Sequence, residues 1–239
     1  MPKFLSPSTL SHSLRLLGLF LAILSPATAQ EKEPDPAKKP EKGIQVRLLA
    51  EQAPAQLGKV FLAFGEAKSA PIALPTNQLS EPRIAPARAM VLKTEDKEVP
   101  LCNIALPELG NAFAVVLVTA KPAGYSPIVV RTDDPAFKAG DVFFINRSDK
   151  TVLGKLGTTP LILKPGQSTK NRPSGAVDGK FYDIAFATRD DKGDKLISTS
   201  RWPIDNLLRS YVFFFTNGQG KTSFRAVDEY LTPPAAAKP

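Results

Sequence analysis

Residues 211–227 read YVFFFTNGQGKTSFRAV, two runs rich in aromatic and branched side chains on either side of Asn217-Gly218. Asn and Gly tolerate positive φ, and this dipeptide between two apolar runs is a strong β-hairpin signal. The stretch therefore predicts two antiparallel strands. Turn-forming residues at 191–194 and 147–150 separate further apolar runs and predict hairpins in the same way.

The rest of the chain repeats this alternation of short apolar runs and turn clusters, which indicates β-strands. No stretch keeps a helical apolar period for three turns, and the recurrent prolines oppose long helices. Only Ile204 to Leu208 suggests one short helical turn. The predicted strands are 44–50, 59–64, 71–74, 88–93, 100–106, 112–119, 127–131, 141–146, 151–156, 160–164, 181–188, 195–201, 210–216 and 221–228.

This strand content predicts an all-β fold of antiparallel β-sandwiches. About 14 strands suit two Ig-like sandwich domains in tandem better than one. Pro and Gly cluster near 121–126, which places an N-terminal sandwich at 44–122 and a C-terminal sandwich at 126–231. The residues show no internal repeat.

Two of the predicted strands are apolar on both faces, 142–145 and 211–215. A strand with one face in water would alternate, so both faces of these strands must be covered. We expect the neighbouring domain to cover them. A docking surface for a partner is the alternative.

The first 29 residues have the character of a secretory signal peptide. Lys3 and Arg15 supply positive charge, 16–24 is a short apolar run, and Ala27 and Ala29 are the small residues of a cleavage site. An uncleaved anchor would need about 20 apolar residues. We expect cleavage after Ala29 and a periplasmic or secreted product with no transmembrane span.

Segments at both ends of the mature chain contain few apolar side chains that could be buried in a core. Residues 30–43 mix acids, lysines and prolines with nothing apolar larger than alanine, and 232–239 reads TPPAAAKP. Such segments cannot offset the entropy of ordering. We interpret them as a disordered tether and a flexible tail.

The chain is modestly basic. Its net charge is +8, and loss of Lys3 and Arg15 with the signal peptide lowers it to +6. This charge permits an anionic envelope polymer as a partner, although ordinary solubility explains it better. We expect an unknown protein or envelope polymer as partner, and no nucleic acid, because no arginine-rich run is present.

Histidine is absent from the mature chain, since His12 is the only one. This excludes histidine-based triads, blue-copper centres and the common catalytic zinc sites. No phosphate-binding G-x-x-x-x-G-K-[ST] loop occurs. We therefore expect a noncatalytic protein with no catalytic residue, no metal and no cofactor.

Cys102 is the only cysteine, so no internal disulfide forms. Within strand 100–106 its side chain shares a face with Ile104, and we expect a buried structural thiol rather than a reactive one. Two aspartate groups, 133–134 and 190–194, are candidates for calcium, but turn formation on a solvated loop explains them better.

The longest connection without strand character is 164–180, which is basic. Loops of this length are functional or disordered, and Lys170 and Arg172 in it are candidates for an anionic ligand. Trp202, the only tryptophan, is a candidate sugar platform or a packing anchor. Asn146-Arg147-Ser148 is a glycosylation sequon.

Five features give the second half a resemblance to a known family. They are Phe144-Ile145-Asn146-Arg147-Ser148, the run LGKLG at 153–157, and STSRWP at 198–203, together with LKPGQ at 163–167 and the closing Phe-rich hairpin. Residues 140–231 resemble an essentially uncharacterised family of exported bacterial Ig-like β-sandwich proteins. The resemblance implies an exported sandwich and no reaction or functional residues.

We therefore expect an exported, noncatalytic binding or structural protein of the cell envelope or extracellular space. A carbohydrate-active module is the first alternative, and it requires an exposed Trp202 in a groove with two carboxylates. A strand-donating assembly chaperone is the second alternative. It requires 141–146 or 210–216 to lie at an open sheet edge.

Overall fold

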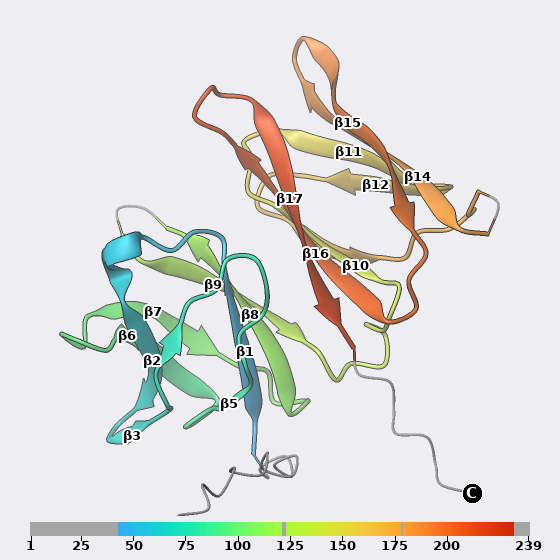
Figure 1. The fold of residues 1–239 in the computed structure, drawn as a ribbon. Coiled ribbons are helices and arrows are strands. Elements are labelled where there is room, and N and C mark those ends of the chain that lie inside the picture. Colours follow the sequence, from blue (N-terminus) through green and yellow to red (C-terminus); the bar gives the residue numbers. More distant parts are fainter. Residues whose placement is uncertain (1–42, 121–122, 178, 232–239) are drawn as a thin grey trace, which may run out of the picture. The chain divides into compact units, whose positions relative to one another are not determined.

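The computed structural model describes residues 43–120, 123–177 and 179–231, which lie in one compact unit. The predicted all-β class is confirmed, because these residues form strands and one turn of 3-10 helix, η1 (Ala55–Leu57). Four sheets make two β-sandwiches, coloured blue to green and yellow-green to red in Figure 1. The segments assigned to the signal peptide, to the tail and to all of the tether except Gly43 lie outside the described residues.

The first sandwich joins sheet β5-β1-β8-β9 to sheet β3-β2-β6-β7, in which β4 also pairs with β2. A cluster of alternate apolar side chains, including Val46, Leu62 and Phe113, fills the space between the sheets. The strands are β1 (Gln45–Ala50), β2 (Lys59–Phe64), β3 (Ala67–Lys68), β4 (Ile72–Ala73), β5 (Arg83–Ile84), β6 (Ala89–Thr94), β7 (Pro100–Ala105), β8 (Ala112–Thr119) and β9 (Tyr125–Arg131).

The second sandwich joins sheet β13-β10-β16-β17 to sheet β12-β11-β14-β15. Its core contains Phe144, Phe186 and Phe214 in mutual aromatic contact. The strands are β10 (Val142–Asn146), β11 (Thr151–Leu156), β12 (Thr159–Leu163), β13 (Ser168–Asn171), β14 (Phe181–Asp190), β15 (Gly193–Pro203), β16 (Leu208–Thr216) and β17 (Thr222–Tyr230).

The two sandwiches have the same topology. In each, the first strand pairs in parallel with the penultimate strand (β1 with β8, β10 with β16), which pairs antiparallel with the last. The opposite sheets correspond as well, with β2, β6 and β7 matching β11, β14 and β15. The sheets are therefore mostly antiparallel, with one parallel pair in each sandwich, and the fold carries a duplication that the residues do not reveal.

The sheets divide later in the chain than the sequence suggested. β8 and β9 pair antiparallel from Phe113–Arg131 to Thr119–Tyr125, so the boundary predicted near 121–126 falls between two paired strands of one sheet, and Tyr125 and Ser126 belong to β9. Both strands belong to the first sandwich. The passage to the second sandwich is the connection 132–141, between β9 and β10.

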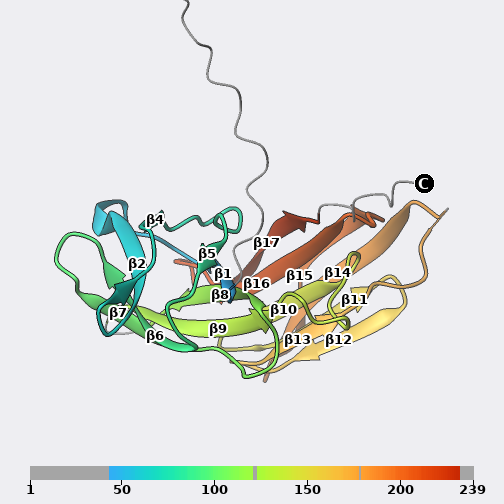
Figure 2. The same cartoon turned by 90° about the horizontal axis from the view of Figure 1, so that it is seen from below.

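Three local predictions are wrong. Residues 204–208 contain a turn and the start of β16, not a helical turn. The connection 164–180 contains β13, which pairs with β10 (Figure 2). Residues 147–150 do not close a hairpin, because β10 and β11 lie in different sheets. The hairpins at 191–192 and 217–221 are present as predicted.

A third apolar cluster joins sheet β5-β1-β8-β9 of the first sandwich to sheet β13-β10-β16-β17 of the second. Leu49, Val116 and Val118 of the first sandwich pack with Phe143 and Tyr211 of the second. Strands β10 and β16 therefore bury one face in their own sandwich and the other against the neighbouring sandwich. This confirms the expected covering of the strands that are apolar on both faces.

No helix in the described ranges combines the length and apolar character needed to cross a bilayer.

Candidate functional site

Two of the three predicted ligand-binding residues line one small cavity. Trp202 at the end of β15 lies opposite Tyr182 on β14, and Arg172 follows β13. The cavity has a volume of about 80 Å³, and Asp141 and Asp205 line it as well. Ligand pockets commonly have at least about 300 Å³, so this one holds a few waters or the tip of a larger molecule.

Arg172 is held by the protein itself. Its Nε donates to Asp141 Oδ1 at 2.6 Å and its Nη2 donates to the Ala139 carbonyl at 2.6 Å. Asp141 also accepts a hydrogen bond from the Lys138 backbone N–H, and its side chain is 9% exposed. The guanidinium thus neutralises a largely buried carboxylate and ties the chain after β13 to the segment before β10.

Trp202 is half-buried and acts as a packing group. Its ring meets Phe186 edge to face, with the centroids 5.9 Å apart, and it packs against the core of the second sandwich. The same residue also lines the cavity. The structure therefore places Trp202 as an anchor with one accessible side, not as an open platform.

Lys170 lies away from the cavity. It is an exposed residue of β13, and its Nζ donates to Asp134 Oδ2 at 2.6 Å. This hydrogen bond lowers the pKa of Asp134. The pair joins β13 to the connection that leads from β9 to β10, so Lys170 does not act together with Arg172 and Trp202.

Aspartates of both predicted calcium-candidate groups form ion pairs with basic side chains of the protein itself. Asp133 contacts Arg131 at 2.7 Å, Asp190 contacts Lys150 at 2.8 Å, and Asp194 contacts Arg189 at 2.7 Å. The hydrogen bond from Lys150 lowers the pKa of Asp190. In the described part of the chain, no three His, Cys, Asp or Glu side chains lie together as a metal site.

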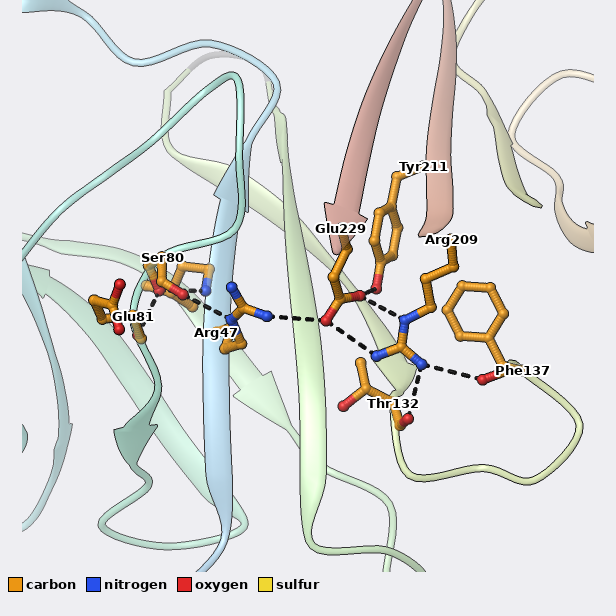
Figure 3. Close-up of polar contacts among 9 residues, drawn as sticks. Arg47, Ser80, Glu81, Thr132, Phe137, Arg209, Tyr211 and Glu229 are labelled. Atoms are coloured by element: carbon orange, nitrogen blue, oxygen red, sulfur yellow. Dashed lines mark hydrogen bonds and ion pairs between the residues drawn. The ribbon is translucent and has the colours of Figure 1, made fainter. Parts of the chain in front are cut away.

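A buried polar cluster lies where the two sandwiches meet, and sequence reasoning missed it (Figure 3). Glu229 on β17 accepts from Arg209 Nε at 2.5 Å and from Arg47 Nη1 at 2.9 Å. The side chains of Arg209 and Glu229 are each 5% exposed. One carboxylate thus contacts a cation from its own sandwich and another from β1 of the first sandwich.

Backbone and phenol groups complete this cluster. Arg209 Nη1 donates to the carbonyls of Thr132 and Phe137 at 2.8 and 3.1 Å, and its guanidinium stacks on the Phe137 ring at 4.7 Å. The Tyr211 hydroxyl donates to Glu229 at 2.9 Å. Burial, then the Glu229 carboxylate, raises the pKa of the Tyr211 phenol.

Arg47 fixes the other end of the cluster. Its Nε donates to the Ser80 carbonyl at 2.8 Å, while the Ser80 hydroxyl accepts from the Leu48 N–H and donates to the Glu81 carbonyl. The Glu229 carboxylate and the Tyr211 phenol are both held in these contacts, so the cluster offers neither a free nucleophile nor a free base. The cluster links the two sandwiches through hydrogen bonds and ion pairs.

Cys102 packs against the core of the first sandwich and is partly buried. Ile104 points into the same core, as the strand periodicity predicts. Burial raises the pKa of the Cys102 thiol to about 11, so the thiol is protonated at neutral pH. Because the thiolate is the nucleophile, this shift opposes reactivity. The side chain is partly buried, not fully buried as expected.

Asn146 of the sequon is fully buried. Its Nδ2 donates to the carbonyls of Lys150 and Leu163, and its Oδ1 accepts from the N–H and hydroxyl of Ser148. The amide holds the connection that crosses from β10 to β11. A glycan on Nδ2 is incompatible with this fold.

No model of a known protein family matches the sequence, and no curated protein matches it.

Proposed function

We propose that this chain is an exported, noncatalytic binding or structural protein of the cell envelope or extracellular space. The N-terminal features described above, a basic start, a short apolar run and Ala27-Thr28-Ala29, support export. The resemblance of 140–231 to exported bacterial Ig-like sandwich proteins supports the same location. The assignment of a family and of a compartment is part of this proposal.

The observation that carries the proposal is the contact of Glu229 with both Arg47 and Arg209. It links the sandwiches through groups that are largely out of water, beside a continuous apolar cluster. Interfaces that are large and apolar oppose relative domain motion. A fixed pair of sandwiches suits a protein that holds partners at a set spacing.

Export is tested by expressing the chain with a C-terminal tag, fractionating the cells and sequencing the N-terminus of the tagged product. We expect a periplasmic or secreted product that begins at Gln30. The matched control replaces Leu19 and Leu21 in the apolar run with Arg, which blocks export. A cytoplasmic product that retains Met1 would contradict the proposal.

Carbohydrate binding is the second candidate, and the cavity beside Trp202 favours it. Arg172, Tyr182, Trp202 and two carboxylates converge there, which partly matches the groove that this alternative requires. Trp202 is the only tryptophan, so its fluorescence reports this one place. A quenchable emission that a glycan protects supports this candidate, and a blue-shifted emission that glycans leave unchanged argues against it.

The strand-donating alternative lacks the edge it requires. β10 and β16 are the two central strands of sheet β13-β10-β16-β17, paired on both sides. Their aromatic side chains are buried, except for Phe215, which is half-buried.

A further inference from the structure

In each sandwich, one sheet lies away from the other sandwich and is here called the outer sheet: β3-β2-β6-β7 in the first and β12-β11-β14-β15 in the second. Each outer sheet carries a groove on its solvent-facing side, and the two grooves occupy equivalent places in the fold. The outer groove of the second sandwich has a volume of about 540 Å³ and is lined by β11, β14 and β15. The outer groove of the first sandwich has a volume of about 400 Å³ and is lined by β2, β6 and β7. Both volumes fall in the range of ligand sites.

Strand register matches the two grooves position by position. In the second sandwich Lys155, Ala185 and Thr199 form one row across the sheet, and Asp183 lies opposite Arg201. The corresponding positions in the first sandwich are Ala63, Val91 and Asn103 for the row, with Ala89 opposite Ala105 for the pair. Ala63, Ala89 and Ala105 of the first groove thus correspond to Lys155, Asp183 and Arg201 of the second groove.

Because both sandwiches have the hollow, its existence follows from the shared sheet geometry and is not by itself a sign of function. The difference lies in the side chains that line it. The first groove has mostly small and apolar side chains and one cation, Lys93, which lies 3.8 Å from Glu98. The second groove has two cations and an acid at positions where the first has alanine.

The cations of the second groove are accessible to a ligand. Arg201 donates to Asp183 at 3.0 Å, but these side chains are 67% and 60% exposed, and exposed pairs contribute little stability. The guanidinium has five donors, so most remain for a ligand. Among the described residues, no acidic side chain lies within ion-pair distance of exposed Lys155.

Two glycines line the second groove at points where the chain approaches itself closely. Gly157 and Gly175 both have positive φ, at 62° and 67°. A Cβ on Gly157 would lie 1.7 Å from the Ser174 carbonyl oxygen, and one on Gly175 would lie 2.5 Å from Thr158 Cγ2. The hydroxyls of Thr158, Thr199 and Ser200 line the sides.

We propose that the outer groove of the second sandwich binds a segment of an acidic polysaccharide, with Lys155 and Arg201 contacting its carboxylates and the lining hydroxyls contacting its hydroxyl groups. The groove is open and bordered by exposed side chains, which suits a polymer. The only large apolar residue of its lining, Ile184, is buried, so the groove offers nothing to an acyl chain or an apolar peptide side chain. This proposal rests on the proposed envelope function and names its ligand.

The test is calorimetric titration of the mature chain, residues 30–239, with polygalacturonate, with neutral dextran as the uncharged polymer. We expect binding of polygalacturonate alone, weakened at least tenfold in K155S/R201S. The matched control is R189S/K221S, because Arg189 is also exposed and paired with an aspartate, and Lys221 is also exposed. This control should bind like the wild type, and all three proteins should unfold at similar temperatures.

Equal losses in both double variants would overturn the proposal, since binding would then follow net charge and not the groove. Absence of binding would also overturn it. Binding to phosphatidylglycerol vesicles or inorganic phosphate, but not to polygalacturonate, would assign the groove to another anion and overturn the polysaccharide. None of these results changes the site of N-terminal cleavage, so the two proposals fail separately.

Discussion

Arg209 on β16 and Glu229 on β17 face each other across the last hairpin, with Nε and Oε2 2.5 Å apart and both side chains 5% exposed. The second oxygen of the same carboxylate contacts Arg47 of the first sandwich at 2.9 Å. A buried pair of this kind does not by itself add stability relative to an apolar replacement. It makes the loss of one partner costly and fixes the geometry of the contact.

We therefore expect Glu229→Gln to lower the free energy of unfolding by about 3–5 kcal/mol, the cost of leaving a buried charge without its partner. Chemical denaturation of the full chain measures it. Asp194→Asn provides the control, because Asp194 pairs with Arg189 in water and the change should cost no more than about 1 kcal/mol. Equal losses in the free energy of unfolding for the two variants would show that Glu229 does not link the two sandwiches.

The hairpin register makes the pair of Arg209 and Glu229 accessible to prediction from sequence. Pairing runs outward from Thr216–Thr222 without a shift, so it sets Arg209 opposite Glu229. Tyr211 and Val227 then share their buried face. A charged pair at the end of such an apolar face is a signal that strand-by-strand assignment overlooks.

Other features could not be predicted in this way because they are not local. Arg47 contacts Glu229 across 182 residues, and β1 pairs with β8 in parallel, which no turn between neighbouring strands implies. β13 (Ser168–Asn171) has no apolar residue, and its strand conformation comes from pairing with β10. The shared topology of the two sandwiches is likewise carried by the backbone, because matched positions such as Ala63 and Lys155 differ in chemistry.

The amide of Asn146 gives a second prediction. Asn146→Ala removes four hydrogen bonds at a fully buried position, including those to the Lys150 and Leu163 carbonyls. Buried unsatisfied groups cost about 1–3 kcal/mol each, so we expect a loss of about 2–4 kcal/mol in the free energy of unfolding. Asn217→Ala is the control at a turn in contact with water, and it should cost about 1 kcal/mol.

The same amide predicts that the sequon stays unmodified. Expressed in a host that glycosylates Asn-x-Ser sites, the folded, secreted chain should have the mass of the unmodified polypeptide, because a chain modified at Asn146 Nδ2 before folding cannot form these buried contacts. A fully glycosylated product that unfolds at the wild-type temperature would contradict the buried position of Asn146.

Gly157 gives a prediction with a close control. Gly157→Ala places a Cβ 1.7 Å from the Ser174 carbonyl oxygen at a φ of 62°. Gly166 also has positive φ, at 77°, but nothing lies within 4 Å of the position that a Cβ on it would take. We expect Gly166→Ala to cost about 1 kcal/mol, the strain of a left-handed residue, and Gly157→Ala to cost at least about 2 kcal/mol more, because backbone must move to admit the methyl group. Similar unfolding temperatures for the two variants would contradict this close approach.

The thiol of Cys102 predicts a pH dependence of stability. Its pKa is about 11 in the fold, against an ordinary value of 9.0, so above pH 9 the unfolded chain loses this proton first. Stability then falls as pH rises. Two pKa units correspond to about 2.7 kcal/mol, and partial exposure reduces this contribution to about 1–2 kcal/mol.

The measurement is the difference in the free energy of unfolding between the wild type and Cys102→Ala, followed from pH 8 to pH 11. The comparison removes the titration of lysines and tyrosines that both proteins share. The advantage of the wild type should be largest at pH 8 and decline between about pH 9 and pH 11. In parallel, iodoacetamide should alkylate the native thiol far more slowly at pH 9 than the unfolded one. A difference that stays constant with pH, together with equal alkylation rates, would place Cys102 in water and contradict its packing against the core of the first sandwich.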